Sequence, residues 1–181
     1  MTQPDDTPNA ASSEPLPTTD STPTSDPDSI ASDPITLAFV CVQNAGRSQM
    51  ATAFARRERD RRGLRGRIRV VTGGTRPADV VHDVVVDAMY ERGIDIADRT
   101  PRKITSDELE AVDVVVTMGC SASGICPATW NGVDRDWDLD DPHGRPLEDV
   151  VRIRDEIERL VEELFDEIET GTVGERRDST E

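Results

Sequence analysis

The sequence predicts a single α/β domain with three layers, in which helices cover both faces of a four-stranded parallel sheet. Short apolar runs of strand length alternate with helical patterns from residue 35 onward. At 181 residues the chain is long enough for one domain with a full core and too short for two. Strands that alternate with helices call for right-handed crossovers, which make neighbouring strands parallel.

The first half of the predicted domain contains two strands and two helices. The apolar run ITLAFVCV, residues 35–42, is the first strand. Residues 47–62 follow as a helix, because apolar residues recur there at four-residue spacing before Gly63. IRVVTGG, residues 68–74, is the second strand, and VVHDVVVDAMYERG, residues 80–93, is a helix closed by its final glycine.

The second half supplies the remaining elements. Thr105 and Glu108 form a capping-box pattern before a short helix. AVDVVVTMG, residues 111–119, is the most apolar strand, and WDL, residues 137–139, is a weak fourth strand. Pro146 opens a long amphipathic helix. Its apolar face contains Val150, Ile153, Ile157, Leu160, Leu164 and Ile168.

Both ends of the chain are expected to lie outside the folded domain. Residues 1–34 are rich in Pro, Ser, Thr and Asp, and this composition cannot bury enough apolar surface to offset the entropy of ordering. We therefore predict a disordered acidic tail over 1–34, a folded domain over 35–170, and a flexible C-terminal tail over 171–181.

The charge balance excludes some partners. The chain has 21 basic and 37 acidic residues, a net charge of −16, and Lys103 is its single lysine. This composition favours a protein adapted to concentrated salt, because at about 1 M salt the Debye length is only ~3 Å and self-repulsion is screened. A merely acidic protein is the alternative. In either case we expect no binding to nucleic acid or to anionic membrane, because no basic patch is present.

The N-terminal composition and the cysteine content favour a cytoplasmic protein, which we expect to be a monomer. Residues 1–46 contain neither Lys nor Arg, so the positive region of a signal peptide is missing, and no apolar segment is long enough to span a bilayer. In a reducing compartment, the three cysteines are expected to be catalytic, metal-binding or inert before they form a structural disulfide.

The stretch CVQNAGRS, residues 41–48, is the strongest chemical signal. A strand, a tight loop with glycine and a helix N-terminus together build a cradle of backbone N–H groups for an anion. Arg47 is placed to clamp a tetrahedral oxyanion through two hydrogen bonds, and Cys41 to act as a thiolate nucleophile. The predicted oxyanion-binding residues are Val42, Gln43, Asn44, Ala45, Gly46, Arg47 and Ser48. The alternative is that Cys41 is a small buried hydrophobic residue.

Three chemically active residues follow predicted strands. Cys41 follows the first strand, Cys120 the third and Asp141 the fourth. Because functional sites of parallel sheets lie at the carboxyl ends of the strands, we expect these residues to meet at one edge.

The stretch CVQNAGRSQMA resembles the oxyanion loop of the low-molecular-weight tyrosine phosphatase superfamily, and in particular its arsenate reductase branch. The resemblance extends from Ile35 to about Ile168 and includes GTRPAD, GID, VVTMGC and DWDLDDP. It implies the fold of these phosphatases and identifies Asp141, before Pro142, as the general acid. The alternative is that Asp141 belongs to a solvated acidic turn.

The resemblance also implies a relay of three cysteines. In thioredoxin-coupled reductases a second cysteine attacks the first and a third resolves the product; these roles fall to Cys120 and Cys126. A disulfide requires Cα atoms within ~7 Å, whereas six helical steps span ~9 Å and six extended steps ~20 Å. The segment between the two cysteines must therefore bend.

We therefore predict a cytoplasmic arsenate reductase that serves arsenic detoxification. It would act on arsenate or phosphate with a thioredoxin-like or small-thiol reductant, without a metal or organic cofactor, and with weak phosphatase side activity. The five-residue gap between Cys120 and Cys126 does not fit zinc, and only His82 and His143 are available as further ligands. Thr52 stands where many related enzymes keep a glutamate that helps to hold potassium. The alternatives are a low-molecular-weight protein tyrosine phosphatase and a thiol protein that captures arsenite or a soft metal.

Overall fold

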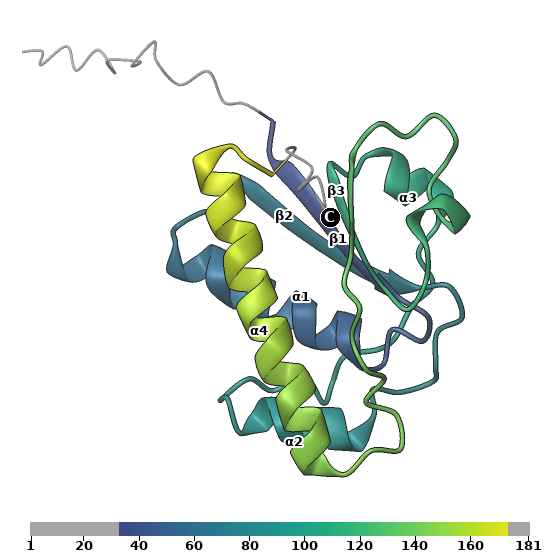
Figure 1. Ribbon diagram of the computed structural model, residues 1–181, viewed down its shortest axis with the longest axis vertical. Helices are drawn as coiled ribbons and strands as arrows, with labels where there is room; N and C mark the ends of the chain where they lie inside the picture. Colours follow the sequence, from purple (N-terminus) through teal and green to yellow (C-terminus); the bar gives the residue numbers. More distant parts are fainter. Residues whose placement is uncertain (1–32, 174–181) are drawn as a thin grey trace, which may run out of the picture. The chain divides into compact units, whose positions relative to one another are not determined.

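The computed structural model describes residues 33–173, which contain a four-stranded sheet. Figure 1 shows helices packed against this sheet. The strands are β1 (Ile35–Cys41), β2 (Ile68–Gly74), β3 (Val114–Met118) and β4 (Val133–Asp136). They lie in the order β2-β1-β3-β4, and each neighbouring pair is parallel. The predicted α/β fold with a four-stranded parallel sheet is therefore confirmed.

Helices cover both faces of the sheet. Three of them, α1 (Arg47–Arg61), α2 (Asp83–Tyr90) and α4 (Leu147–Thr170), pack against one another and one face (Figure 1). The short helix α3 (Ser106–Glu110) and the 3₁₀ turn η1 (Ala122–Gly124) belong to the other face. Among the described residues, no helix is long and apolar enough to cross a membrane.

The central strand β1 separates two hydrophobic clusters. Its alternate residues Leu37 and Phe39 pack with the large helices, whereas Ala38 and Val40 pack with α3 and its flanking segments. All four side chains are fully buried. A parallel strand covered on both faces needs an unbroken apolar run, which explains why this strand was predictable.

The predicted position of the fourth strand was wrong. Trp137–Leu139 was expected to form it, but β4 ends at Asp136. β4 is an edge strand whose residues alternate between half-buried and exposed, so its sequence VDRD lacks an apolar run. Trp137 instead follows the strand, where its ring lies 5.8 Å from that of Phe39.

Most helix boundaries agree with the sequence patterns. The helix expected over residues 47–62 is α1, and Gly63 beyond it has a φ of +70°. The capping box of Thr105 and Glu108 is present at α3. The helix expected over 80–93 was too long, because α2 spans eight residues and the residue before it is extended.

The apolar face predicted for α4 is present and wider than expected. Val150, Ile153, Ile157 and Leu164 are buried as predicted, and Leu160 and Ile168 are partly buried. Val161 and Phe165 extend this face and are fully buried. The predicted tails, 1–34 and 171–181, lie largely outside the described residues, so their predicted disorder stays a prediction.

Candidate active site

The carboxyl ends of the strands bring the predicted catalytic residues to one edge of the sheet. Cys41 ends β1, Cys120 follows β3 and Asp141 follows β4. A small cavity of about 10 Å³ lies at this edge. Its lining comprises Cys41, Val42, Gln43, Gly46, Arg47, His82 and Asp141. The structure thus brings the predicted nucleophile, anion clamp and general acid around one cavity.

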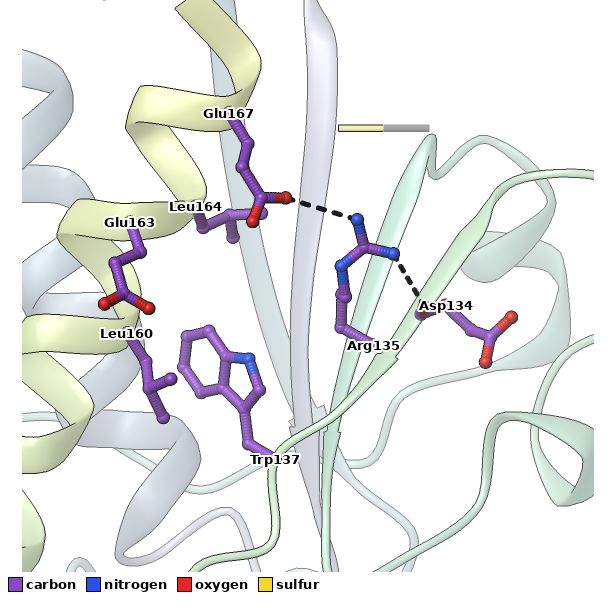
Figure 2. A pocket seen from close by; sticks show the side chains of 7 residues that line it. All are labelled: Asp134, Arg135, Trp137, Leu160, Glu163, Leu164 and Glu167. Carbon is purple, nitrogen blue, oxygen red and sulfur yellow. Dashed lines mark hydrogen bonds and ion pairs between the residues drawn. The ribbon is translucent and has the colours of Figure 1, made fainter. Parts of the chain in front are cut away.

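A wider groove lies elsewhere, between β4 and α4 (Figure 2). Its volume is about 420 Å³. Trp137 and Leu160 line it, and Arg135 Nη2 lies 3.2 Å from Glu167 Oε2. Its lining contains neither a thiol nor an imidazole. The smaller cavity is therefore the candidate active site, because it alone of these two spaces contains a nucleophile.

Hydrogen-bond donors surround the Cys41 sulfur. The backbone N–H of Asn44 donates to Cys41 Sγ at 3.1 Å, and Ser48 Oγ lies 2.9 Å from the same sulfur. Within residues 33–173, no side chain caps the N-terminus of α1, so the positive end of its dipole faces the loop. These donors and this dipole favour the binding of an anion beside Cys41.

Asn44 holds the loop in shape. Its φ of +51° is unusual for a residue other than glycine. Its side-chain amide donates to Ser48 Oγ at 2.9 Å and to Thr72 Oγ1 at 2.8 Å. Its carbonyl Oδ1 accepts from the backbone N–H of Arg102 at 3.0 Å. The sequence patterns indicated Asn44 as a loop residue, but they gave no indication of these distant partners.

Glycine permits the close approach of β2 to the loop. A Cβ atom on Gly74 would lie 2.6 Å from the Val42 carbonyl oxygen and 2.9 Å from the Asn44 nitrogen. Gly74 is part of the IRVVTGG run, so its place at the end of a strand was predictable. Its close approach to the oxyanion loop depends on the pairing of β1 with β2, and this could not be predicted from the sequence.

Arg47 connects the loops that follow three strands. Its Nη1 donates to the Leu139 carbonyl at 2.8 Å, and its Nη2 lies 3.3 Å from Asp141 Oδ2. A Cβ on Gly119, whose φ is +76°, would lie 3.0 Å from Arg47 Nη2. Asp141 thus occupies part of the guanidinium that an incoming oxyanion would bind.

The other two cysteines lie on the opposite face of the sheet from the Cys41 side chain. Cys41 belongs to the cluster with the large helices, whereas Cys120 and Cys126 pack against the cluster with α3. The Cys120 thiol donates to the Val40 carbonyl oxygen at 3.6 Å. All three cysteines are free thiols.

Burial raises the pKa of the Cys120 thiol, and nearby Cys41 adds to this effect while the charge of Arg47 opposes it. Burial also raises the pKa of Cys126, with smaller contributions from Asp134 and Cys120. These two groups are therefore mostly protonated at neutral pH.

The segment between these cysteines contains a turn, and the disulfide expected between them stays a prediction. This segment contains η1, and the Cys126 N–H donates to the Ala122 carbonyl at 2.8 Å. Beyond it, the Trp130 indole N–H donates to the Val112 carbonyl at 2.7 Å and anchors the end of the loop.

Two histidines, His82 in the lining of the cavity and His143 against its ring, were considered from the sequence only as metal ligands. The rings of His82 and His143 have centroids 4.7 Å apart and planes tilted by 50°. The described part of the chain contains no group of three or more His, Cys, Asp or Glu side chains placed to hold a metal ion. The contact between His82 and His143 could not be predicted from the sequence, because the two residues lie 61 positions apart in the chain.

Comparison with known proteins agrees with this architecture. Residues 36–173 match the family described as low molecular weight phosphotyrosine protein phosphatase. The chain belongs to this family. Among curated members, a putative arsenate reductase of Halobacterium salinarum is 57% identical over 132 residues, which are 72% of this chain and 91% of that protein.

Solved structures of two arsenate reductases share the fold of this chain. A thioredoxin-dependent arsenate reductase of Corynebacterium glutamicum aligns with a TM-score of 0.63 and 31% identity, over 78% of this chain and 65% of that one. A structure described as an arsenate reductase in the phosphate binding state aligns with a TM-score of 0.63 and 33% identity, over 74% of this chain and 98% of that one.

Proposed function

We propose that this chain reduces arsenate to arsenite through Cys41 and a relay that uses Cys120 and Cys126. The observation that carries the proposal is that Cys41 lies in the oxyanion loop after β1, while two further free thiols, Cys120 and Cys126, follow the neighbouring strand β3. Hydrolysis of a phosphate ester needs only one of these thiols. The arsenate reductases among the relatives support the same activity.

The first half of the reaction uses the small cavity. Arsenate binds the amides of the loop and Arg47, and it displaces Asp141 from the guanidinium. The Cys41 thiolate attacks arsenic while Asp141 donates a proton to the departing oxygen, which leaves as water. Proton donation of this kind contributes ~10²–10⁴ in rate. The product is an As(V) adduct on the Cys41 sulfur.

The second half transfers two electrons to arsenic. The Cys120 thiolate attacks the Cys41 sulfur, the S–As bond breaks, and its electron pair leaves with arsenic as arsenite. Cys126 then attacks Cys120, which frees the Cys41 thiolate and forms a Cys120–Cys126 disulfide. A dithiol reductant of the thioredoxin class, or a small thiol, reduces this disulfide by exchange.

The relay requires movement of the loop that contains η1. Cys120 and Cys126 pack on the α3 face, whereas Cys41 faces the large helices. A bond between Cys41 and Cys120 therefore requires the loop to shift across the strand ends. Gly119, with a φ of +76°, and the anchored Trp130 bound the segment that would move.

The proposal extends to where the protein works, which is the cytoplasm. A net charge of −16 with a single lysine supports a cytoplasm rich in salt as its working environment. A monomer whose resting cysteines are reduced fits that compartment.

Cysteine variants test the relay. Cys120→Ser should release no arsenite even in a single turnover, because the adduct has no internal attacker. Cys126→Ser should release one equivalent and then stall as a Cys41–Cys120 disulfide that is detectable by mass. Both variants should still hydrolyse an aryl phosphate slowly, whereas Cys41→Ser should do neither. Full multiple turnover by Cys126→Ser with thioredoxin would refute the assignment of the resolving cysteine.

A further inference from the structure

We propose that His82 and His143 form a gate that admits inorganic oxyanions to the cavity and disfavours the entry of aryl phosphates. The inference rests on the proposed function, because it names the class of oxyanion that reaches Cys41. The two imidazoles come from separate segments, one just before α2 and one just after Asp141 and Pro142. Their ring centroids lie 4.7 Å apart, within the range of paired aromatic rings.

Each histidine is fixed to a different part of the site. The backbone N–H of His82 donates to the Ala45 carbonyl at 3.0 Å, and the imidazole Nε2 lies 3.2 Å from Gln43 Oε1. The backbone N–H of His143 donates to Asp141 Oδ1 at 3.0 Å. Contact between the two rings therefore joins the oxyanion loop to the segment that carries the general acid.

The space beneath this pair is narrow. A Cβ atom on Gly46 would lie 2.7 Å from Pro142 Cγ and 3.7 Å from His82 Cδ2, so the loop is in contact with the proline. The cavity of about 10 Å³ is close to the ~10–15 Å³ that one water molecule requires. Entry of any oxyanion therefore requires Asp141 to leave Arg47.

The reaction geometry explains why the pair discriminates between anions. Asp141 protonates the leaving oxygen, so any substituent on that oxygen must point toward Asp141 and out through the mouth. In arsenate the substituent is a hydrogen atom. In an aryl phosphate it is a ring, which would have to pass the paired, mutually tilted imidazoles of His82 and His143 and separate them.

The charges around His82 favour the closed arrangement at neutral pH. Burial lowers the pKa of His82, and the charge of His143 lowers it further, while Asp141 and Asp83 oppose these effects. A neutral His82 can remain in contact with the second ring without repulsion.

Binding measurements on the full chain test the gate without requiring catalysis. We would titrate inorganic phosphate and phenylphosphonate into the wild type, His82→Ala and His143→Ala by calorimetry. Both variants should bind phenylphosphonate about tenfold more tightly, a change of about 1.4 kcal/mol, and bind phosphate within about twofold of the wild type. His143→Phe keeps a ring and should retain the exclusion.

Tyr90→Ala is the matched control, because Tyr90 is 73% exposed on α2 and lies outside the lining of the cavity. Unchanged phenylphosphonate affinity in both alanine variants would overturn the gate. Weaker affinity would also overturn it, since the rings would then be a platform for aryl groups.

The gate and the proposed arsenate reductase activity can fail independently of each other. Loss of anion selectivity in a protein that never releases arsenite would support the gate and refute the reductase. Arsenite release by a protein whose histidine variants keep the anion selectivity of the wild type would support the reductase and refute the gate.

Discussion

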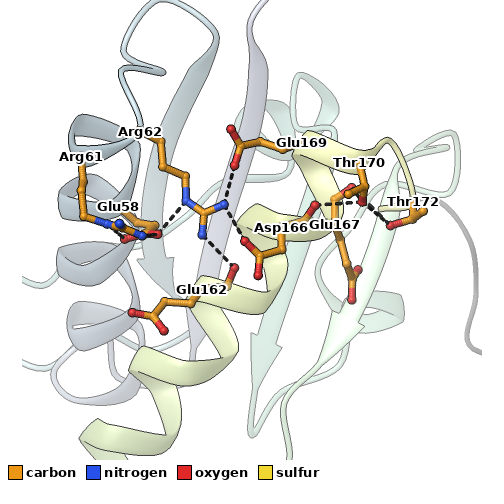
Figure 3. Close-up of polar contacts among 9 residues, drawn as sticks. All are labelled: Glu58, Arg61, Arg62, Glu162, Asp166, Glu167, Glu169, Thr170 and Thr172. Carbon is orange, nitrogen blue, oxygen red and sulfur yellow. Dashed lines mark hydrogen bonds and ion pairs between the residues drawn. The ribbon is translucent and has the colours of Figure 1, made fainter.

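Two mostly buried arginines at opposite ends of α1 have very different surroundings. Arg62, just after the helix, has a side chain 13% exposed, and it bonds to Glu58 at 2.7 Å, Asp166 at 2.7 Å and Glu169 at 2.5 Å (Figure 3). Arg47, the first residue of the helix, has a side chain 10% exposed, and among the described residues it pairs with one carboxylate, that of Asp141, at 3.3 Å.

The difference separates a charge that holds two helices together from one that the proposed function assigns to substrate binding. Burial opposes ionisation of Arg62, but its hydrogen bonds with Glu169, Glu58 and Asp166 outweigh burial and raise its pKa. These bonds tie α1 to α4. Arg47 has one long ion pair that an oxyanion can replace, so part of its binding capacity remains available for substrate. Four predictions test this contrast.

The largest effect is expected at Arg47. Arg47→Lys keeps the charge but loses the planar fork that holds two oxygens at once. Arsenate reduction and aryl phosphate hydrolysis should both fall by about 10²–10³ in kcat/KM, while the thermal midpoint changes little. Steady-state kinetics and calorimetry would measure both. Near-normal turnover in this variant would show that the loop amides alone bind the oxyanion.

The second prediction concerns the thiol beside Arg47. Because burial raises the pKa of Cys120, the fraction of reactive thiolate should rise about tenfold per pH unit through the neutral range. Formation of the Cys41–Cys120 disulfide in a single turnover should accelerate accordingly from pH 6.5 to 8.5. Rapid quenching with an alkylating agent and mass analysis would follow this step. A rate independent of pH would indicate that Cys120 is already a thiolate at pH 6.5, which contradicts a raised pKa.

Arg62 should affect stability and leave catalysis intact. Arg62→Ala should lower the free energy of unfolding by about 1–3 kcal/mol, because Glu58, only 3% exposed, loses one of its two arginine partners. Asp166 and Glu169 are 68% and 44% exposed, so their pairs should contribute little. Urea denaturation would measure the loss. A large fall in kcat/KM of the folded variant would contradict the division between the two arginines.

The smallest effect is the dependence of stability on acid. Hydrogen bonding with Arg61, aided by Arg62 and opposed by burial, lowers the pKa of Glu58 in the folded chain. The unfolded chain then binds more protons, so this contribution is present above the unfolded pKa of about 4.3 and is lost as the pH falls through the lower folded value.

Arg61→Ala should reduce this acid sensitivity more than Arg62→Ala, since Arg61 has the largest effect on Glu58. Unfolding at pH 7 and at pH 4 compares the two variants. Equal pH dependence in the wild type and both variants would show that Glu58 does not set it.

Much of the fold and of the candidate site was predictable because it depends on local patterns. β1 is an unbroken apolar run, and the residues after parallel strands must share an edge, which placed Cys41, Cys120 and Asp141 together. The Thr105 capping box is likewise a pattern of four residues.

The remainder depends on contacts between distant segments. Asn44 bonds to Thr72 and to Arg102, which are 28 and 58 residues away. The pairing of His82 with His143 and the bonds of Arg62 to α4 are similarly distant. β4 was misplaced because a half-exposed edge strand has little apolar content, so the neighbouring Trp137 gave the stronger signal.

The edge position of β4 also bears on how copies of the protein meet. An outer strand presents backbone N–H and C=O groups that can pair with a strand of another molecule and start aggregation. In β4, the outward residues Asp134 and Asp136 are exposed carboxylates, and the strand is only four residues long. A second copy aligned on this edge would bring like charges together. The short length and the carboxylates of β4 therefore disfavour association of two copies through this edge of the sheet.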